Sequence, residues 1–171
     1  MAALLRQLVG LTKSLPSPLR ENVGMKLFTM AYVPLIASCR PKVLQVSDGA
    51  ALVQMPLRRR TRNHLNSMYF GAFAIGGDIT GGVLAMHMCI EQDAVLVPSF
   101  KDVHIDFLRR AERDVFFSTR DADGSIREAI RHAAATGERV NVPMTIDAHV
   151  HEPEKELVAE IALTLSLKSP K

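Results

Sequence analysis

The sequence predicts an α+β fold in which a curved antiparallel β-sheet wraps one long central helix. The run between Met68 and Ile90 is apolar or small except for one charge, Asp78, so a helix here would be apolar on every side and must be enclosed. The stretches before and after it alternate apolar and polar residues, which is typical of strands with one buried face. The run is the only segment that can cover these faces.

Composition indicates one domain with a substantial core, because 47% of the 171 residues are hydrophobic. We expect a single domain over residues 1–171, with an N-terminal helical cover at 1–40 and the core at 41–168. The net charge is only +3 and aromatic residues are few, so we expect no nucleic-acid partner. Cys39 and Cys89 lie far apart in apolar surroundings, which indicates that both cysteines are reduced. The N-terminal residues lack the pattern of a signal peptide, so we expect a cytoplasmic protein.

The central segment, residues 61–92, allows three interpretations. Its length would span a bilayer, although we expect no membrane span because the flanking strands need an apolar cover. A break at Gly76 and Gly77 would give two short elements. The third interpretation is one core helix, in which glycines, each costing about 1 kcal/mol of helix propensity, let the sheet's side chains press against the helix backbone. Its glycines are Gly71, Gly76, Gly77, Gly81 and Gly82.

The N-terminal segment predicts two helices. Leu4, Leu8, Leu11 and Leu15 recur at helical spacing, and a second helix is expected over Leu19 to Tyr32. The cations on the polar side of this segment are few, Arg6 and Lys13, so we expect these helices to cover a core rather than anchor the chain in a membrane.

From Pro41 onward the pattern predicts a sheet. A hairpin with a Ser47-Asp48-Gly49 turn comes first, and Ala51, Val53, Met55 and Leu57 share the face of its second strand that should lie on the central helix. Residues 94–108 predict a long strand, bent or bulged near Pro98, with Val103, Ile105 and Phe107 on one face.

Three further strands and one helix complete the expected core. Strands are expected over residues 113–121, 139–151 and 156–168. Between the first two, Ser125 and Glu128 form a capping-box pattern ahead of an apolar stripe that ends at Gly137, which predicts a surface helix. The stripe consists of Ile126, Ile130, Ala133 and Ala134.

This order of elements resembles the hotdog fold, and the residues extend the likeness. Thioesterases of the phenylacetate-pathway type carry the motif N-x-x-G-x-x-H-G-G followed by an acid on the same helix. In this chain Asn63 matches the asparagine, Asn66 stands at the first glycine, and Tyr69, Phe70 and Gly71 stand at the His-Gly-Gly positions, with Asp78 at the acid. The chain is also similar to the DUF4442 branch of hotdog proteins from about residue 20 onward, including the Asn63-His64-Leu65 segment.

The resemblance implies a catalytic site. Thioester hydrolysis needs an oxyanion site, which the backbone amides of Phe70 and Gly71 would supply, and an activating group, for which Asp78 matches the general base or nucleophile. Asn63 would orient water or substrate from the neighbouring subunit, and Tyr69 would border the acyl tunnel. Other roles stay open: Asp78 as a hydrogen-bond partner of a backbone group or a helix cap, and Asn63 as a helix cap or turn residue.

Two charged groups outside the motif also have alternative interpretations. Arginines before the central helix and after the long strand would bind the phosphates of coenzyme A, or they form a solvated face. They are Arg58, Arg59, Arg60, Arg62, Arg109 and Arg110. His149, His151 and Glu152 look like a metal cluster, but period two places both histidines on the solvent face, so we expect no metal.

The predicted function is hydrolysis of an acyl-CoA or similar acyl thioester, with coenzyme A as part of the substrate and no other cofactor. The resemblance implies a homodimer or a dimer of dimers, with each site between subunits. A non-catalytic binder of acyl or lipid-like ligands on the same fold is the alternative function.

Overall fold

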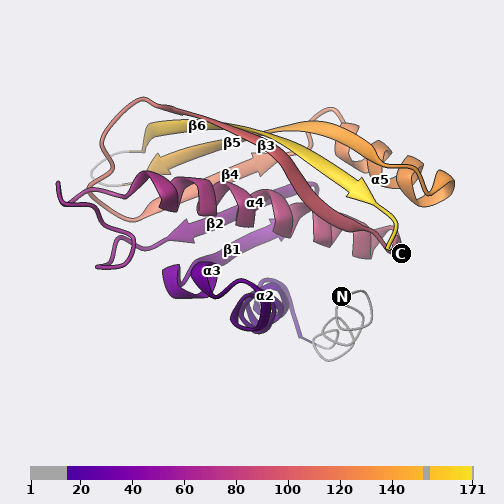
Figure 1. Cartoon of the computed structure of the whole chain (residues 1–171), viewed down its shortest axis with the longest axis horizontal. Coiled ribbons are helices and arrows are strands. Elements are labelled where there is room, and N and C mark those ends of the chain that lie inside the picture. The colour runs from indigo at the N-terminus through magenta and orange to yellow at the C-terminus, as the bar shows by residue number, and fades with distance from the viewer. Residues whose placement is uncertain (1–14, 152–154, 171) are drawn as a thin grey trace.

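The computed structural model describes residues 15–151 and 155–170 (Figure 1). Its helices are α2 (Leu19–Tyr32), α3 (Pro34–Cys39), α4 (Phe70–Glu91) and α5 (Ser125–Thr136). Its strands are β1 (Lys42–Ser47), β2 (Ala50–Met55), β3 (Val97–Phe107), β4 (Val115–Arg120), β5 (Val140–Val150) and β6 (Glu156–Lys168). The helix predicted from Leu4, Leu8 and Leu11 lies outside the described residues.

The six strands form one antiparallel sheet in the order β1-β2-β4-β5-β6-β3. Helix α4 runs along one face of this sheet and contacts all six strands (Figure 1). The predicted α+β architecture, a long central helix wrapped by a curved antiparallel sheet, is therefore confirmed. The first and last strands of the order, β1 and β3, are the two edges of the sheet.

Helix α4 is continuous through Gly76 and Gly77, so the break considered from the sequence does not occur. Eleven of its 22 residues are buried, so α4 is the core helix of the third interpretation. Its length and apolar composition alone would allow it to cross a membrane, but 61% of its most apolar window is buried inside the molecule.

Close packing explains three of the glycines in α4. A Cβ atom on Gly76 would collide with the ring of Phe117 from β4, and one on Gly81 would lie 2.7 Å from Sδ of Met144 on β5. At Gly77 the nearest atom would be Cγ2 of Ile161, at 3.2 Å. The sheet's side chains therefore rest directly on the helix backbone, as the sequence predicted.

Strand β3 is the exposed edge of the sheet. The sequence predicted that Val103, Ile105 and Phe107 share one apolar face of this strand, but Val103 and Phe107 are each 51% exposed. The irregularity predicted near Pro98 lies elsewhere, because Pro98 pairs regularly with Leu167 and the register shifts between Phe100 and Val103. An extra residue in β3 at that point bends the strand.

The other edge, β1, is covered by the segment that contains α2. The side-chain amide of Asn22 donates to the carbonyl of Val43 at 2.7 Å and accepts from its N–H at 2.9 Å, so it takes the place of a neighbouring strand. Ser17 donates to the carbonyl of Val46 at 3.3 Å. Within α2 only Thr29 is buried, so this helix covers the sheet edge rather than a wide apolar face.

Helix α5 begins differently from the predicted capping box. Ser125 is its first residue, and the carboxylate of Asp121 accepts from the amides of Ile126 and Arg127 at 2.9 and 3.1 Å. Gly137 ends the helix in the left-handed conformation, as expected. The buried stripe contains Ile126, Ile130 and Ala133, whereas Ala134 is exposed.

Candidate functional site

The loop between β2 and α4 is held in place by side-chain to backbone hydrogen bonds. The hydroxyl of the buried Thr61 donates to the carbonyl of Pro56 at 2.6 Å and accepts from the amide of Arg58 at 2.9 Å. Asn63 Oδ1 accepts from the amides of Leu65 and Ser67 at 2.9 and 3.2 Å. These bonds set the position at which α4 begins.

Asn63 is thus a turn residue in the described structure, whatever further role it has. Its Nδ2 also donates to Oγ of Ser67 at 3.1 Å. One N–H of this amide still points to no described acceptor, and the residue lines a cleft at the start of α4. The turn role considered from the sequence and a contact with substrate are therefore compatible.

The first turn of α4 carries free backbone donors. Tyr69 precedes the helix in extended conformation, and its amide donates to the carbonyl of Thr61 at 2.8 Å. The next bonded amide is that of Ala72, which donates to the carbonyl of Tyr69. Among the described residues, no acceptor meets the amides of Phe70 and Gly71. Free donors at the positive end of a helix dipole form a site for an oxyanion.

Gly71 allows the Tyr69 ring to fold over this first turn. A Cβ atom at Gly71 would lie 2.6 Å from Cε1 of Tyr69. The rings of Tyr69 and Phe70 pack with centroids 4.6 Å apart. A side chain at position 71 would displace Tyr69, so the glycine fixes the shape of the cleft wall next to the free amides.

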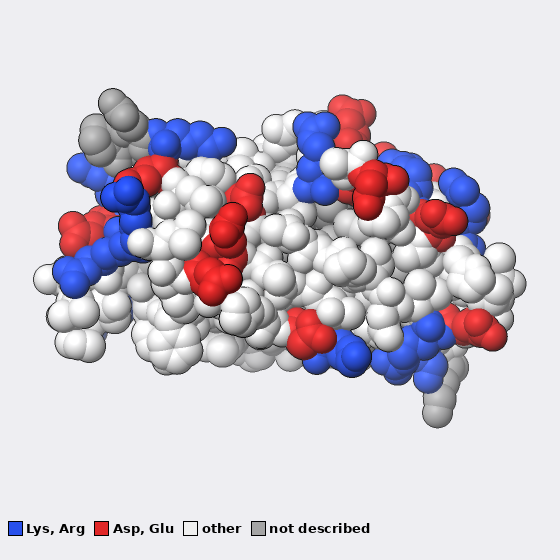
Figure 2. All heavy atoms as spheres, turned by 90° about the horizontal axis from the view of Figure 1, so that it is seen from above, with Lys and Arg blue, Asp and Glu red and all other residues white. Residues whose placement is uncertain are grey.

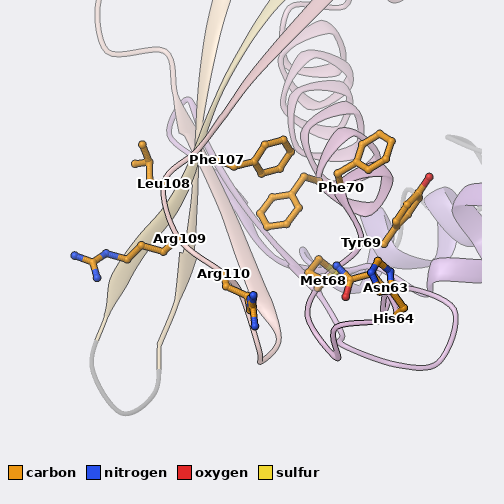
Figure 3. A pocket seen from close by; sticks show the side chains of 10 residues that line it. Asn63, His64, Met68, Tyr69, Phe70, Phe107, Leu108, Arg109 and Arg110 are labelled. Carbon is orange, nitrogen blue, oxygen red and sulfur yellow. The ribbon is translucent and has the colours of Figure 1, made fainter.

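The cleft at this end of α4 has a volume of about 570 Å³ and is mostly apolar (Figure 3). The ring of Phe107, at the end of β3, reaches toward α4 and meets Phe73 edge-on at a centroid distance of 5.2 Å. Lining residues are Asn63, His64, Met68, Tyr69, Phe70, Phe73, Phe107, Leu108, Arg109 and Arg110. The cleft therefore suits an apolar ligand group that carries a polar atom at the helix start.

Of the six predicted arginines, only Arg109 and Arg110 line the cleft. Arg109 pairs with Glu156 through Nε and Oε1 at 2.9 Å, and its side chain extends away from the aromatic rings (Figure 3). Arg110 pairs with Glu112, with Nη1 3.7 Å from Oε1. The other four are exposed in the loop before α4 and are absent from the cleft lining: Arg58, Arg59, Arg60 and Arg62.

Asp78 lies about 12 Å farther along α4 than Phe70, two turns away at 1.5 Å per residue. It lines a second hollow, of about 390 Å³, between α4 and the edge strand β3, where Phe100 and Val103 also lie. No described residue hydrogen bonds or pairs with its carboxylate. Burial raises the pKa of this carboxyl above its ordinary value, because nothing compensates the lost hydration.

The structure therefore gathers five of the predicted residues at one cleft and leaves Asp78 outside it. Asn63, Tyr69, Phe70, Arg109 and Arg110 line the cleft. Gly71 adjoins them in the first turn of α4. Within one chain, the free amides and the unpaired carboxylate face two different hollows.

Several cleft residues were missed from the sequence. Phe107 stood on the face of a strand that was expected to lie against the core, and Phe73 follows Phe70 at helical spacing within an apolar run. Their convergence depends on the pairing of β3 with β6, which no local pattern encodes. For His64 the available signal was local, because this residue adjoins Asn63 in the sequence.

The histidines near the β5–β6 connection do not form a described metal site. His151 stacks on Phe116 with a centroid distance of 4.0 Å, and Glu152 lies outside the described residues. Within residues 15–151 and 155–170, no group of three His, Cys, Asp or Glu side chains is arranged to hold a metal ion.

Known structures share this arrangement of helix and sheet. A Pseudomonas aeruginosa protein of unknown function, described as a probable thioesterase, is 22% identical, with a TM-score of 0.70 over 91% of this chain and 98% of its own. A thioesterase family protein from Silicibacter pomeroyi is 16% identical, with a TM-score of 0.64 over 87% and 99% of the two chains. A protein of unknown function from Chlorobaculum tepidum is 9% identical, with a TM-score of 0.75 over 90% and 97%.

At these identities the likeness establishes the fold, which is the hotdog fold that the resemblance implied. The sequence matches none of the curated proteins with which it was compared. The model of the family described as a domain of unknown function, DUF4442, matches residues 23–167, which include α4, the whole cleft lining and all of the strands except the last residue of β6. The chain therefore belongs to the DUF4442 family of hotdog-fold proteins.

Proposed function

We propose that the protein hydrolyses acyl thioesters in a site shared by two copies of the chain. The observation that carries this proposal is the pair of free amides, Phe70 and Gly71, at the positive end of α4 and beside an apolar cleft. Thioesterase family proteins of the same fold support it. The acyl group would lie among the aromatic rings, and the thioester carbonyl would accept from the two amides.

In this mechanism Asp78 is the general base. Its carboxylate takes a proton from water while the water oxygen bonds to the thioester carbon, and the carbonyl oxygen becomes an oxyanion held by the amides. When the carbon–sulfur bond breaks, the thiolate takes the proton back from Asp78. The products are a carboxylic acid and a thiol. A pKa raised by burial makes this carboxylate a stronger base than an exposed aspartate.

A second copy is needed because one chain holds these groups in separate hollows. The hollow of Asp78 opens beside β3, and β3 is the exposed edge of the sheet. Edge-to-edge pairing of two β3 strands about a two-fold axis would place the Asp78 of one copy near the α4 start of the other. Asn63 would then face the shared site from the copy that supplies the amides.

Replacing one carboxylate tests this assignment. We expect Asp78→Asn to abolish turnover of acyl-CoA substrates, since the amide cannot accept a proton from water. Asp102→Asn is the matched control, because Asp102 lines the same hollow and undergoes the same change. Unchanged turnover in a folded Asp78→Asn variant, judged by circular dichroism, would refute the catalytic role of Asp78.

We further propose that the arginines near the cleft contact the phosphates of coenzyme A. Arg109 and Arg110 line the cleft, and four exposed arginines precede α4, at positions 58, 59, 60 and 62. Replacing Arg109 and Arg110 with Ala should raise KM for acyl-CoA, leave kcat nearly unchanged and reduce the dependence of KM on salt. The matched change of Arg60 and Arg62 should have the smaller effect, because they stand outside the cleft lining. Equal kinetics of both variants and the parent at low and high salt would indicate a substrate without phosphates.

Binding without catalysis is the second candidate function. It is favoured by Tyr69 and Phe70, which occupy the positions of a histidine and a glycine in the thioesterase motif and place two rings at the cleft. A protein that hydrolyses no thioester across a range of chain lengths, yet retains a fatty ligand detectable by mass spectrometry, would support this function instead.

A further inference from the structure

Helix α2 turns an apolar face away from the body of the protein. Asn22, Met25 and Thr29 are directed toward β1 and the core, as the Asn22 bonds to Val43 and the burial of Thr29 show. On the opposite side, at helical spacing, lie Leu19, Val23, Lys26, Leu27 and Met30. Leu27 is 45% exposed and Met30 is 61% exposed. An outward helix face that is apolar except for one lysine has no partner among the described residues.

The apolar face continues into the neighbouring elements. Leu35 of α3 is 66% exposed, and helices α2 and α3 contact each other. Large exposed apolar side chains of α2, α3 and β1 are Leu19, Leu27, Met30, Tyr32, Leu35 and Leu44. We call Leu19, Lys26, Leu27, Met30 and Leu35 the N-terminal apolar surface. Tyr32 is set apart, because its ring stacks on Phe28 with centroids 5.4 Å apart, on another side of α2. Large exposed apolar side chains grouped on neighbouring elements are a candidate interaction site.

Charge distinguishes between the partners that this surface could take. The expectation that the N-terminal helices only cover the core counted Arg6 and Lys13 alone. The first 47 residues contain six lysines and arginines in all and one acidic residue, although the whole chain has 18 acids. That acid, Glu21, has a side chain only 9% exposed and pairs with Arg20 at 2.6 Å. Lys26, Arg40 and Lys42 are exposed. The described residues 15–47 therefore expose apolar and cationic side chains and no acid. The next exposed acid is Asp48, in the turn after β1.

We propose that the N-terminal apolar surface docks on an anionic lipid bilayer. Apolar side chains would enter the headgroup region while the cations contact lipid phosphates. A second copy fits less well, because two-fold pairing through α2 would bring the two Lys26 ammonium groups into one apolar interface. A bilayer instead lets the lysine stem lie along apolar surface while its charge reaches the headgroups.

The position of the surface keeps the cleft accessible during docking. Helix α2 covers β1, at one edge of the sheet, while Phe107 and Leu108 of the cleft lie at the end of β3, the opposite edge (Figure 1). Figure 2 shows the molecule of Figure 1 from above. This face carries charges of both signs around a broad uncharged area, so it offers no continuous cationic surface. Docking is independent of the proposed hydrolysis and is tested without it.

Vesicle flotation with the full chain tests the proposal. The parent should bind phosphatidylcholine vesicles that contain phosphatidylglycerol, bind vesicles of phosphatidylcholine alone at least about tenfold more weakly, and lose affinity as salt rises. Leu27→Glu with Met30→Glu, and separately Lys26→Glu, should weaken binding by about tenfold or more. Leu65→Glu is the matched control, since Leu65 is 49% exposed in the loop before α4 and should not affect flotation.

Other outcomes would overturn the proposal. Equal binding of the parent and the α2 variants would place any lipid contact elsewhere. Absence of flotation, combined with a larger sedimentation coefficient for the parent than for the Leu27→Glu, Met30→Glu variant, would assign the face to contacts between copies. Flotation that appears only after deletion of residues 1–14 would show that those residues cover the face in the full chain.

Discussion

At the scale of single residues, the partly buried carboxylate of Asp78 lowers the stability of the folded state. Its pKa is raised by burial, and no described donor compensates, so the folded state binds its proton more tightly than the unfolded state does. Folding stability attributable to Asp78 therefore falls as the pH rises from the ordinary pKa of 3.8 through the raised folded value. Such a cost is typical of a functional group.

We predict that Asp78→Asn is more stable than the parent at neutral pH. The amide has no charge to desolvate, so the difference in the free energy of unfolding should be largest above the raised pKa and should vanish as the pH falls toward 3.8. Urea unfolding at several pH values measures it. A variant less stable than the parent at neutral pH would mean that the carboxylate has a stabilising partner, such as a donor from a second copy.

The residues around the cleft show what local sequence can and cannot predict. Asn63, Tyr69, Phe70 and Gly71 follow one another closely in the chain, so a motif finds them together and the structure keeps them together. Phe107 joins them from a distant strand. That contact depends on sheet order and on the register shift within β3, which are tertiary properties.

At the scale of elements, the glycines of α4 fall into two classes. Gly76 meets the Phe117 ring, whereas a Cβ atom on Gly82 would find nothing within 4 Å. The first glycine is therefore required by packing within the chain. The second carries only the helix-propensity cost, unless another molecule approaches it.

We predict opposite effects of alanine at these two positions. Gly76→Ala should destabilise the fold by about 1–3 kcal/mol, because the buried Phe117 ring must move. Gly82→Ala should stabilise the isolated chain by about 0.5–1 kcal/mol through helix propensity. Thermal or urea unfolding measures both changes. Should Gly82→Ala destabilise instead, a second molecule must pack against this side of α4.

Element boundaries were predictable where periodicity was strong. The expected helix over Leu19 to Tyr32 matches α2, and the alternating strands β5 and β6 appear where predicted. Signals from single residues were less reliable. Pro98 did not mark the irregularity of β3, and Asp121 caps α5 in place of the Ser125 pattern, because side-chain partners and strand pairing decide these details.

At the scale of the whole molecule, the two sheet edges differ. The side chains of Asn22 and Ser17 satisfy backbone groups of β1, so this edge is not free to pair with another strand. Strand β3 has β6 on one side and no described strand on the other. An uncovered edge strand with exposed apolar residues is a site for pairing. The proposed shared site requires that pairing.

The last prediction is that pairing through β3 controls both assembly and activity. Val103→Lys places a charge on the exposed apolar residue of the open edge, where two copies would bring two lysines close together. It should shift the protein from dimer to monomer in sedimentation velocity at micromolar concentration and reduce thioester turnover, because Asp78 then no longer reaches the amides of Phe70 and Gly71. Val103 also lines the hollow of Asp78, so turnover should recover as rising protein concentration restores the dimer, which separates lost assembly from a direct effect of the new charge on Asp78. Leu44→Lys is the matched control on β1, whose edge Asn22 already occupies, and it should leave assembly unchanged. A parent that sediments only as a monomer while turning over thioesters would refute the shared site, since one chain would then suffice.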